Sequence, residues 1–230
     1  MSPDRFREIT SAYGALRVVL VGDFCLDRYL EIDPARSEVS IETGLAVHNV
    51  VRVRSQPGAA GTILNNLVAL GVGRVEVVGV CGDDGEGYEL RRALDGLRGV
   101  GTRGFLTCAD RRTFTYCKPL VVRAGQAPEE LNRLDLKNWD PTPAAVRGRL
   151  SAALREAVEG AHAVVVLDQV DVAETGVVTA DLRGLLGELA GAHPEKLFLA
   201  DSRRGLGGWP ALGFKMNAAE LAALEGEGAG

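Results

Sequence analysis

Four short runs of apolar, largely β-branched residues limit what this chain of 230 residues can fold into. They occupy positions 18–21, 75–80, 163–167 and 197–200. Apolar residues fill these runs almost continuously, which is typical of strands buried on both faces of a parallel sheet. We therefore expect four central strands of one sheet.

Between these runs, apolar residues recur at the three- and four-residue spacing of amphipathic helices. One such stripe extends from Val146 to Val158 and another from Val178 to Leu189, and shorter ones cover 62–70 and 90–97. Strands and helices that alternate in this way predict a doubly wound α/β fold, with a mostly parallel sheet and helices on both faces.

Two segments, 29–54 and 104–135, carry β-prone alternation but no helical pattern. We expect them to form a small β lid over the carboxyl ends of the strands, where ligands bind in this architecture. The alternative is that they form edge strands with no lid role. No internal repeat or linker divides the chain, so we expect a single domain. The last residues, Glu225–Gly230, are rich in Gly and Glu, which predicts a loop or a frayed end.

Composition and charge exclude several classes of protein. The chain has 31 acidic and 26 basic residues, a net charge of −5, and no basic run longer than two residues, which argues against a nucleic-acid partner. No apolar stretch is long enough for a membrane span or a signal peptide, so we expect a cytoplasmic protein without a membrane partner. The four cysteines form no C-x-x-C pair and the three histidines have no ligand spacing, which predicts free thiols and no histidine metal site.

Three common catalytic motifs are absent from the sequence. It contains no G-x-x-x-x-G-K-[ST] loop, no G-x-G-x-x-G after the first strand and no G-x-S-x-G elbow. A P-loop nucleotide site, a dinucleotide-binding oxidoreductase and an α/β-hydrolase are therefore disfavoured.

Polar residues near the expected strand ends are the candidate site. Asp23 and Asp27 follow the first strand, where a carboxylate can either accept hydrogen bonds from sugar hydroxyls or cap a loop. The small residues of 57–62 precede a helix and permit a close approach of the backbone to a ligand. Asp83 and Asp84, after the 75–80 strand, favour a helix N-cap pair.

Further along the chain, Asp168 and Asp201 each end a predicted strand, so both are expected at the ligand-binding edge of the sheet. Asn217 and Glu220 lie three residues apart at the start of a helix. Their spacing fits either a hydrated Mg²⁺ beside phosphates or a capping box, and by itself does not decide between them.

Taken in order, these segments resemble the PfkB (ribokinase-like) carbohydrate kinase family, and within it the heptose-7-phosphate kinases. Residues 21–29 are close to V-G-D-x-x-L-D-R-Y, 57–71 to the P-G-G-A-A-N segment and its helix, 132–135 to R-L-D, 168 to the Asp of S-D-Y-x-K-G, 201–203 to D-P-K, and 217–220 to N-x-x-E. The similarity covers about residues 16–224, and its order and spacing are more specific than any one motif.

The resemblance implies a ribokinase-like fold and in-line transfer of the ATP γ-phosphate, with Mg²⁺, to a hydroxyl of a sugar or sugar phosphate. For the sugar, it implies that Asp27 and Gly58 line the pocket and that Lys118 and Arg133 meet a phosphate on the substrate. For the transfer itself, it implies that Asp168 lies near the reacting phosphoryl group. For the nucleotide, it implies that Arg203 lies near the phosphates and that Asn217 and Glu220 lie near Mg²⁺. It also suggests a homodimer formed through the lids.

Three departures from the family pattern fall in the expected sugar pocket. Ala59 replaces the second Gly of the Gly-Gly pair, and Thr62 stands where the family has an Asn that contacts the sugar. Asp171 stands where the heptose kinases carry Lys, which reverses a charge. These departures bear on the identity of the substrate more than on the fold.

A fourth departure concerns catalysis. The family's general base is the Asp of a G-A-G-D motif, whose amides also form an anion hole, and no such motif occurs in these 230 residues. The resemblance places this base beyond Gly230, so no residue of the chain is assigned to it. We therefore expect the chain to be the N-terminal part of one kinase domain, incomplete at the C-terminus and inactive alone, since one oxyanion donor is worth about 10²–10³ in rate. The alternative is a non-catalytic protein that binds a sugar or nucleotide.

Overall fold

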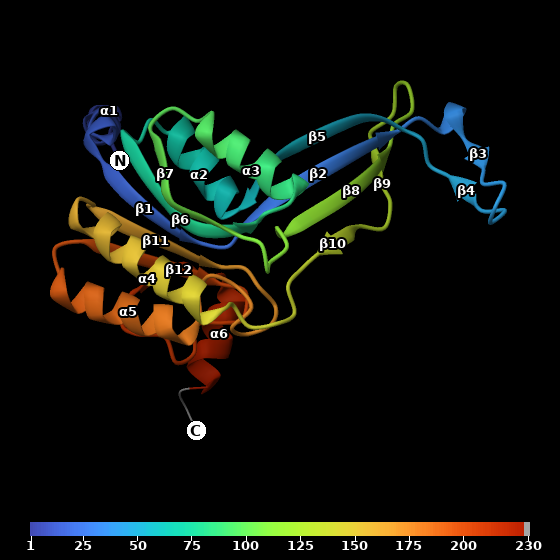
Figure 1. The fold of residues 1–230 in the computed structure, drawn as a ribbon. Coiled ribbons are helices and arrows are strands. Elements are labelled where there is room, and N and C mark those ends of the chain that lie inside the picture. The colour runs from blue at the N-terminus through green and yellow to red at the C-terminus, as the bar shows by residue number, and fades with distance from the viewer. Residues whose placement is uncertain (228–230) are drawn as a thin grey trace.

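A six-stranded parallel sheet forms the body of the protein, whose computed structural model describes residues 1–227 (Figure 1). Its strands lie in the order β13 (Gly213–Phe214), β12 (Leu197–Ser202), β11 (Ala163–Asp168), β1 (Arg17–Gly22), β6 (Arg74–Gly82) and β7 (Val100–Cys108). All neighbouring strands are parallel. The four predicted strands are confirmed as β1, β6, β11 and β12.

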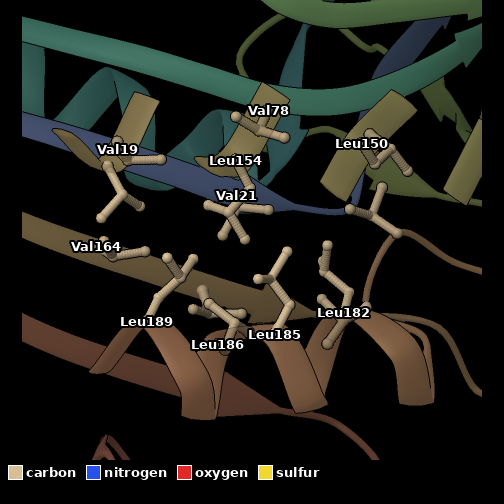
Figure 2. Close-up of a cluster of buried hydrophobic side chains, with 14 of the residues drawn as sticks. Val19, Val21, Val78, Leu150, Leu154, Val164, Leu182, Leu185, Leu186 and Leu189 are labelled. Carbon is tan, nitrogen blue, oxygen red and sulfur yellow. The ribbon is translucent and has the colours of Figure 1, made fainter. Parts of the chain in front are cut away.

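Helices cover both faces of this sheet, which confirms the doubly wound fold. On one face, α4 (Ala144–Glu159) and α5 (Ala180–Ala192) contribute Leu154 and Leu186 to an apolar cluster that also contains Val21 of β1 (Figure 2). On the other face, α2 (Ala60–Ala69) and α3 (Gly85–Asp95) pack against Leu20. Successive residues of β1 are thus buried on opposite faces, which is why the run is apolar throughout.

A second sheet forms the lid, with the order β10 (Leu134–Leu136), β8 (Thr115–Val121), β2 (Phe24–Ile32) and β5 (Val50–Ala59). The short β9 (Glu129–Glu130) pairs with β8. A small hairpin of β3 (Glu38–Val39) and β4 (Ala46–Val47) lies at the end of the lid remote from the body (Figure 1).

The lid boundaries differ from the predicted ones. The first lid strand begins at Phe24 rather than at 29, because the chain leaves β1 at Gly22, whose φ of 149° an L side chain rarely adopts. The stretch 104–108 belongs to β7 of the body and not to the lid. As an edge strand of the body, β7 has a mixed pattern of burial that resembles a lid strand in sequence.

The end of the chain also differs from its prediction. The helix α6 (Ala218–Glu227) follows β13, so residues 225–227 of the expected Glu225–Gly230 loop are helical. Ala, Leu and Glu fill most of α6, and these good helix formers carry the helix past Gly226. Gly230 and the two residues before it lie outside the described residues, and so does the predicted general base beyond Gly230.

Two further features complete the fold. The N-terminal helix α1 (Pro3–Ser11) was not predicted from the sequence. None of its residues is buried, so its sequence does not need the apolar stripe by which a packed helix is recognised. Two short 3₁₀ turns, η1 (Tyr13–Ala15) and η2 (Pro34–Arg36), precede β1 and follow β2. No helix within residues 1–227 combines the length and apolar character that crossing a membrane requires. All four cysteines are free thiols.

Candidate functional site

The carboxyl end of β1 and the loop that follows β11 are joined by the side chain of Asp23. Its two carboxylate oxygens accept hydrogen bonds from the backbone amides of Gln169, at 2.8 Å, and Val177, at 2.7 Å. Asp23 is buried, and burial raises its pKa to about 6 even though the two amides favour the charged form. The structure therefore supports loop capping for Asp23, because neither oxygen is left without a backbone partner.

Asp27 and Lys118 form an ion pair on one face of the lid. Lys118 Nζ lies 2.8 Å from Asp27 Oδ1, and the two side chains are only 19% and 13% exposed. Burial alone would lower the pKa of Lys118, but the hydrogen bond and charge of Asp27 raise it. The resemblance named both residues, and the structure brings them into contact.

Gly58 lies beside this pair because β5 runs antiparallel to β2 with Gly58 opposite Cys25. A Cβ at position 58 would lie 2.5 Å from Asp27 Oδ2 and 2.7 Å from Cys25 Sγ. Only glycine leaves the Asp27 carboxylate in its observed place. Residues 25, 27, 58 and 118 thus form one polar cluster, which we call the lid cluster.

The positive charge of Arg133, a neighbouring residue of the lid, is also neutralised. Arg133 makes two hydrogen bonds to Asp135, at 2.6 and 2.8 Å, as their predicted shared face allows, and its guanidinium lies 4.6 Å from the centre of the Tyr116 ring. Arg133 therefore lies on the lid as predicted, but its charge is balanced by a neighbouring carboxylate.

Asp168 lies at the carboxyl end of β11 and is fully buried. Its Oδ2 accepts hydrogen bonds from Ser202 Oγ and from Arg204, both at 2.8 Å, and its Oδ1 has no partner within residues 1–227. Burial raises the pKa of Asp168, opposed by Ser202 and Arg204. A buried carboxylate oxygen without a partner is uncommon in proteins, because most buried polar atoms are hydrogen-bonded.

The arginine at this carboxylate is Arg204, which the sequence analysis missed. Arg203, which the resemblance placed near nucleotide phosphates, is exposed, and its side chain makes no hydrogen bond or ion pair within the described residues. β12 ends at Ser202, and both arginines lie in the turn that follows it, where the Arg204 amide donates to Ser202 Oγ at 3.2 Å. Because strand alternation does not extend into this turn, the sequence carried no signal that separates Arg204 from Arg203.

Asn217 and Glu220 form a capping box at the start of α6. The Asn217 amide donates to Glu220 Oε2 at 2.7 Å, and the Glu220 amide donates to Asn217 Oδ1 at 2.9 Å. Glu220 also lines an open hollow together with Ser202, the partner of Asp168. The geometry is therefore that of the capping box. The second carboxylate oxygen of Glu220, Oε1, takes no part in it.

This donor set fits a hydrated Mg²⁺ better than a dehydrated ion. No three His, Cys, Asp or Glu side chains of residues 1–227 gather closely enough to hold a metal. Mg²⁺ commonly keeps several waters and uses one or two carboxylates beside substrate phosphates. Glu220 is the residue present that suits such a site.

A second, shallow hollow lies between the start of the lid strands and the loop after β11, and we call it the cleft. Its walls are largely aromatic and aliphatic and include Phe24, Phe114, Tyr116, Trp139 and Val170. Ala59, at the end of β5, also lines it, with φ 53° and ψ −118°. Thr62 is exposed on the first turn of α2 and does not line the cleft.

Two loops beside the cleft are held by other buried groups. Arg111, also missed in the sequence, is buried and donates to the carbonyl oxygens of Asp140, at 2.8 Å, and Thr175. Asp84 caps α3 through the Gly87 amide at 2.8 Å, which confirms its predicted role, and it also accepts from Thr113. An arginine in a polar loop carries no sequence signal for burial, because its partners are backbone carbonyls.

Comparison with known proteins identifies relatives, although no family model matches the chain. The Bifunctional protein HldE of Pelobacter propionicus is 35% identical over 180 residues, 76% of this chain and 35% of the relative. The HldE of Geobacter metallireducens is 33% identical over 183 residues, 79% of this chain and 34% of that protein. The chain therefore spans about a third of the length of these curated relatives.

A solved structure agrees with the fold. The carbohydrate kinase from Agrobacterium tumefaciens aligns with a TM-score of 0.53 at 21% identity, over 80% of this chain and 53% of that chain. At this identity the likeness concerns the arrangement of strands and helices.

Proposed function

We propose, from the premise that the chain belongs to a PfkB-like carbohydrate kinase family related to the HldE proteins, that it binds the acceptor of an ATP-dependent phosphoryl transfer to a sugar or sugar phosphate. The observation that supports this proposal is that the lid begins beside Asp168, because the ends of β1 and β11 are neighbours in the sheet. The loop tied to Asp23 begins directly after Asp168, and the lid begins directly after Asp23.

In this proposal Asp27 accepts hydrogen bonds from the acceptor's hydroxyls. Lys118 orients the Asp27 carboxylate, and Gly58 leaves room for it. The free Oδ1 of Asp168 is a further acceptor near the transferred group, with Arg204 balancing its charge. Catalysis of this kind depends on positioning and on charge neutralisation rather than on covalent chemistry.

For the nucleotide, we propose that Arg203 reaches phosphates, since it is exposed and unpaired among the described residues. Glu220, through its remaining oxygen, would hold a hydrated Mg²⁺, with Asn217 keeping Glu220 at the helix start. When bound, Mg²⁺ neutralises the charge of phosphate oxygens. The general base of the family has no counterpart motif in these 230 residues, and its place beyond Gly230 stays a prediction.

The alternative, a binding protein without kinase chemistry, is favoured by two observations. Ala59 holds a backbone conformation that suits glycine, and the side chains of Asn217 and Glu220 are already engaged with each other's backbone amides. The kinase hypothesis and the binding-protein hypothesis both predict that an acceptor binds at the lid cluster. They differ in whether a phosphoryl group is transferred once the family's catalytic motif is supplied.

We further propose that two copies associate through their lids. The hairpin tip exposes Val39, Ile41 and Leu45, and the edge strand β5 exposes Val51 and Val53. An exposed apolar edge strand is a ready site for association. The free cysteines suit a reducing compartment, so we also propose a cytoplasmic location.

Isothermal titration calorimetry with a panel of hexoses, heptoses and their monophosphates tests the proposed function. We expect saturable binding of at least one sugar by this chain, and binding about tenfold weaker in Asp27→Asn, because a charged acceptor is lost. The matched control is Asp110→Asn, which removes the same charge from an exposed loop residue. We expect no ADP release by the chain alone.

Failure of every sugar in the panel to bind would contradict the proposal. So would equal affinities of Asp27→Asn and Asp110→Asn for the sugar that binds. To separate the kinase from the alternative, a kinase segment containing G-A-G-D is supplied in trans. ADP release that depends on the sugar favours the kinase, and its absence with intact binding favours the binding protein.

A further inference from the structure

An open groove lies at the amino end of the body sheet, on the face that α4 covers, and we call it the amino-end groove. Its volume of about 640 Å³ is within the range of pockets that bind small molecules. Arg17 and Arg74, the first residues of β1 and β6, line it. Asp23 and the lid follow the other end of β1, so the groove and the lid cluster lie at opposite ends of this strand (Figure 1).

Small residues on α4 and β7 leave this space open. On β7, a Cβ at Gly104 would lie 3.5 Å from the Cβ of Ala153, so the two elements approach closely there. Toward the end of α4 the wall is formed by Ala157, whose side chain is too short to fill the gap. A Cβ at Gly101 would lie 2.5 Å from Arg74 Nη2. The Arg74 guanidinium therefore lies over the backbone of β7, inside the groove.

Two positive charges face each other across neighbouring strands in this groove. Arg17 and Arg74 are directly opposite in the parallel register of β1 and β6. Both side chains lie on the α4 face, because Val19 and Val78, two and four residues further along, belong to the apolar cluster beneath α4. Like charges in such positions repel each other unless a counter-charge lies near them.

The carboxylates of the groove leave one of these charges without a partner. Arg74 Nε lies 2.7 Å from Glu76 Oε1, and Arg103 Nη1 lies 3.1 Å from Glu156 Oε1. The Arg17 side chain makes no hydrogen bond or ion pair with any residue of 1–227; its backbone amide donates to a histidine. Three arginines and two glutamates line the groove, so its net charge is +1.

The charged residues just outside the groove do not change this balance. Asp95, which accepts a hydrogen bond from a threonine hydroxyl of the lining, and Glu159, at the end of α4, each add one negative charge. Arg98, two residues before β7, and Lys196, whose Nζ donates to the Glu159 carbonyl oxygen at 3.1 Å, each add one positive charge. The excess positive charge is therefore local to the two opposed arginines.

We propose that the amino-end groove binds an organic phosphate, whose phosphate oxygens lie between the guanidinium groups of Arg17 and Arg74. A phosphate group carries about −1.5 to −2 at neutral pH and pairs with the planar fork of a guanidinium through two hydrogen bonds. It supplies the counter-charge that Arg17 lacks. The organic part of the ligand lies against the methyl groups of Ala153 and Ala157 and the side chain of Val100. This site does not depend on the acceptor site proposed at the lid.

Isothermal titration calorimetry with phenyl phosphate at fixed ionic strength tests the site. We expect saturable binding of phenyl phosphate, whereas phenol, the same ring without the phosphate, does not bind. Arg17→Gln should weaken the binding about tenfold, because a hydrogen bond to a charged group is lost. The matched control is Arg92→Gln, which removes an exposed arginine of α3 whose side chain has no partner within the described residues.

A further substitution locates the organic part of the ligand. Ala157→Leu places a larger side chain in the groove, so it should weaken binding of phenyl phosphate about fivefold and leave the weaker binding of inorganic phosphate unchanged.

Urea denaturation in a buffer without phosphate gives an independent measurement. Arg17→Gln should raise the denaturation midpoint, because it removes the repulsion between two like charges. Arg92→Gln should leave the midpoint unchanged. A residue with a purely structural role would lower the midpoint when substituted.

Absence of phenyl phosphate binding, or equal affinities of Arg17→Gln and Arg92→Gln, would overturn the proposed site. Binding of phenol as tightly as phenyl phosphate would overturn the ligand class, and an unchanged affinity in Ala157→Leu would overturn the placement of the organic part. A lower denaturation midpoint in Arg17→Gln would overturn the unpaired charge that the site requires. None of these results bears on sugar binding at the lid cluster, which is measured separately.

Discussion

Ala59 has φ 53° and ψ −118°, a backbone conformation that an L side chain adopts only with strain. Such strain costs about 1–3 kcal/mol, of which part is offset by the greater flexibility of glycine in the unfolded chain. We therefore predict that Ala59→Gly raises the free energy of unfolding by about 1 kcal/mol, as measured by urea denaturation.

The control for this prediction is Ala152→Gly, an exposed position inside α4. There the same substitution should lower stability by about 1 kcal/mol, because glycine is a poor helix former. If both variants lose stability equally, position 59 is not strained.

The buried carboxylate of Asp23 should make stability depend on pH. Its pKa is raised from 3.8 to about 6, so the folded state holds the proton more tightly than the unfolded state. The stability that this proton contributes is fully present below about pH 4 and is lost as pH rises through 6, a change of about 3 kcal/mol.

We predict that this dependence disappears in Asp23→Asn. Urea denaturation of both proteins between pH 4 and pH 8 measures it as the difference between their unfolding free energies, so that other titrating groups cancel. The unsubstituted protein should lose stability relative to Asp23→Asn as pH rises. A difference that does not change with pH would show that burial leaves the pKa of Asp23 near its ordinary value.

At the scale of elements, the loop of residues 169–177 connects β11 to α5 and forms one wall of the cleft. Asp23 holds its amides, and Arg111 donates to the carbonyl oxygen of Thr175. We predict that Arg111→Met costs about 2 kcal/mol, because the buried carbonyl of Thr175 and the partly buried carbonyl of Asp140 lose their donor.

Hydrogen exchange locates this effect. The amides of Gln169 and Val177 should exchange about tenfold faster in Arg111→Met, since the loop opens more often. Arg112→Met is the control, because the Arg112 side chain is exposed and makes no hydrogen bond or ion pair within the described residues. Equal exchange in both variants would mean that Arg111 does not hold the loop.

At the scale of the whole molecule, the lid extends away from the body and exposes apolar residues along β5 (Figure 1). We predict that the protein is a dimer by light scattering and that Val53→Glu converts it to a monomer, because a charge is placed in an apolar interface. Leu70→Glu, which changes an exposed leucine just after α2, should leave the dimer intact. A monomeric unsubstituted protein, or dissociation by both substitutions, would contradict association through the lid.

The sequence by itself determined the body of the molecule. The runs that became β1, β6, β11 and β12 were recognisable because strands covered on both faces must be apolar at successive positions. The stripe of α4 was equally clear, since one face of that helix is buried along its whole length. Asp27, Gly58 and Asp168 also stood out, because the order of their motifs resembled a known family.

Only the tertiary structure decided which charges are available to a ligand. The pairing of Lys118 with Asp27 and of Lys137 with Asp171 joins residues 91 and 34 positions apart. The tertiary structure also places Arg204, rather than Arg203, at Asp168, and it pairs the Asp23 carboxylate with backbone amides of a distant loop. Sequence patterns record burial along one element, whereas a hydrogen bond or ion pair depends on where two elements meet, and the pairing of strands within each sheet and the packing of loops at the sheet edge set that geometry.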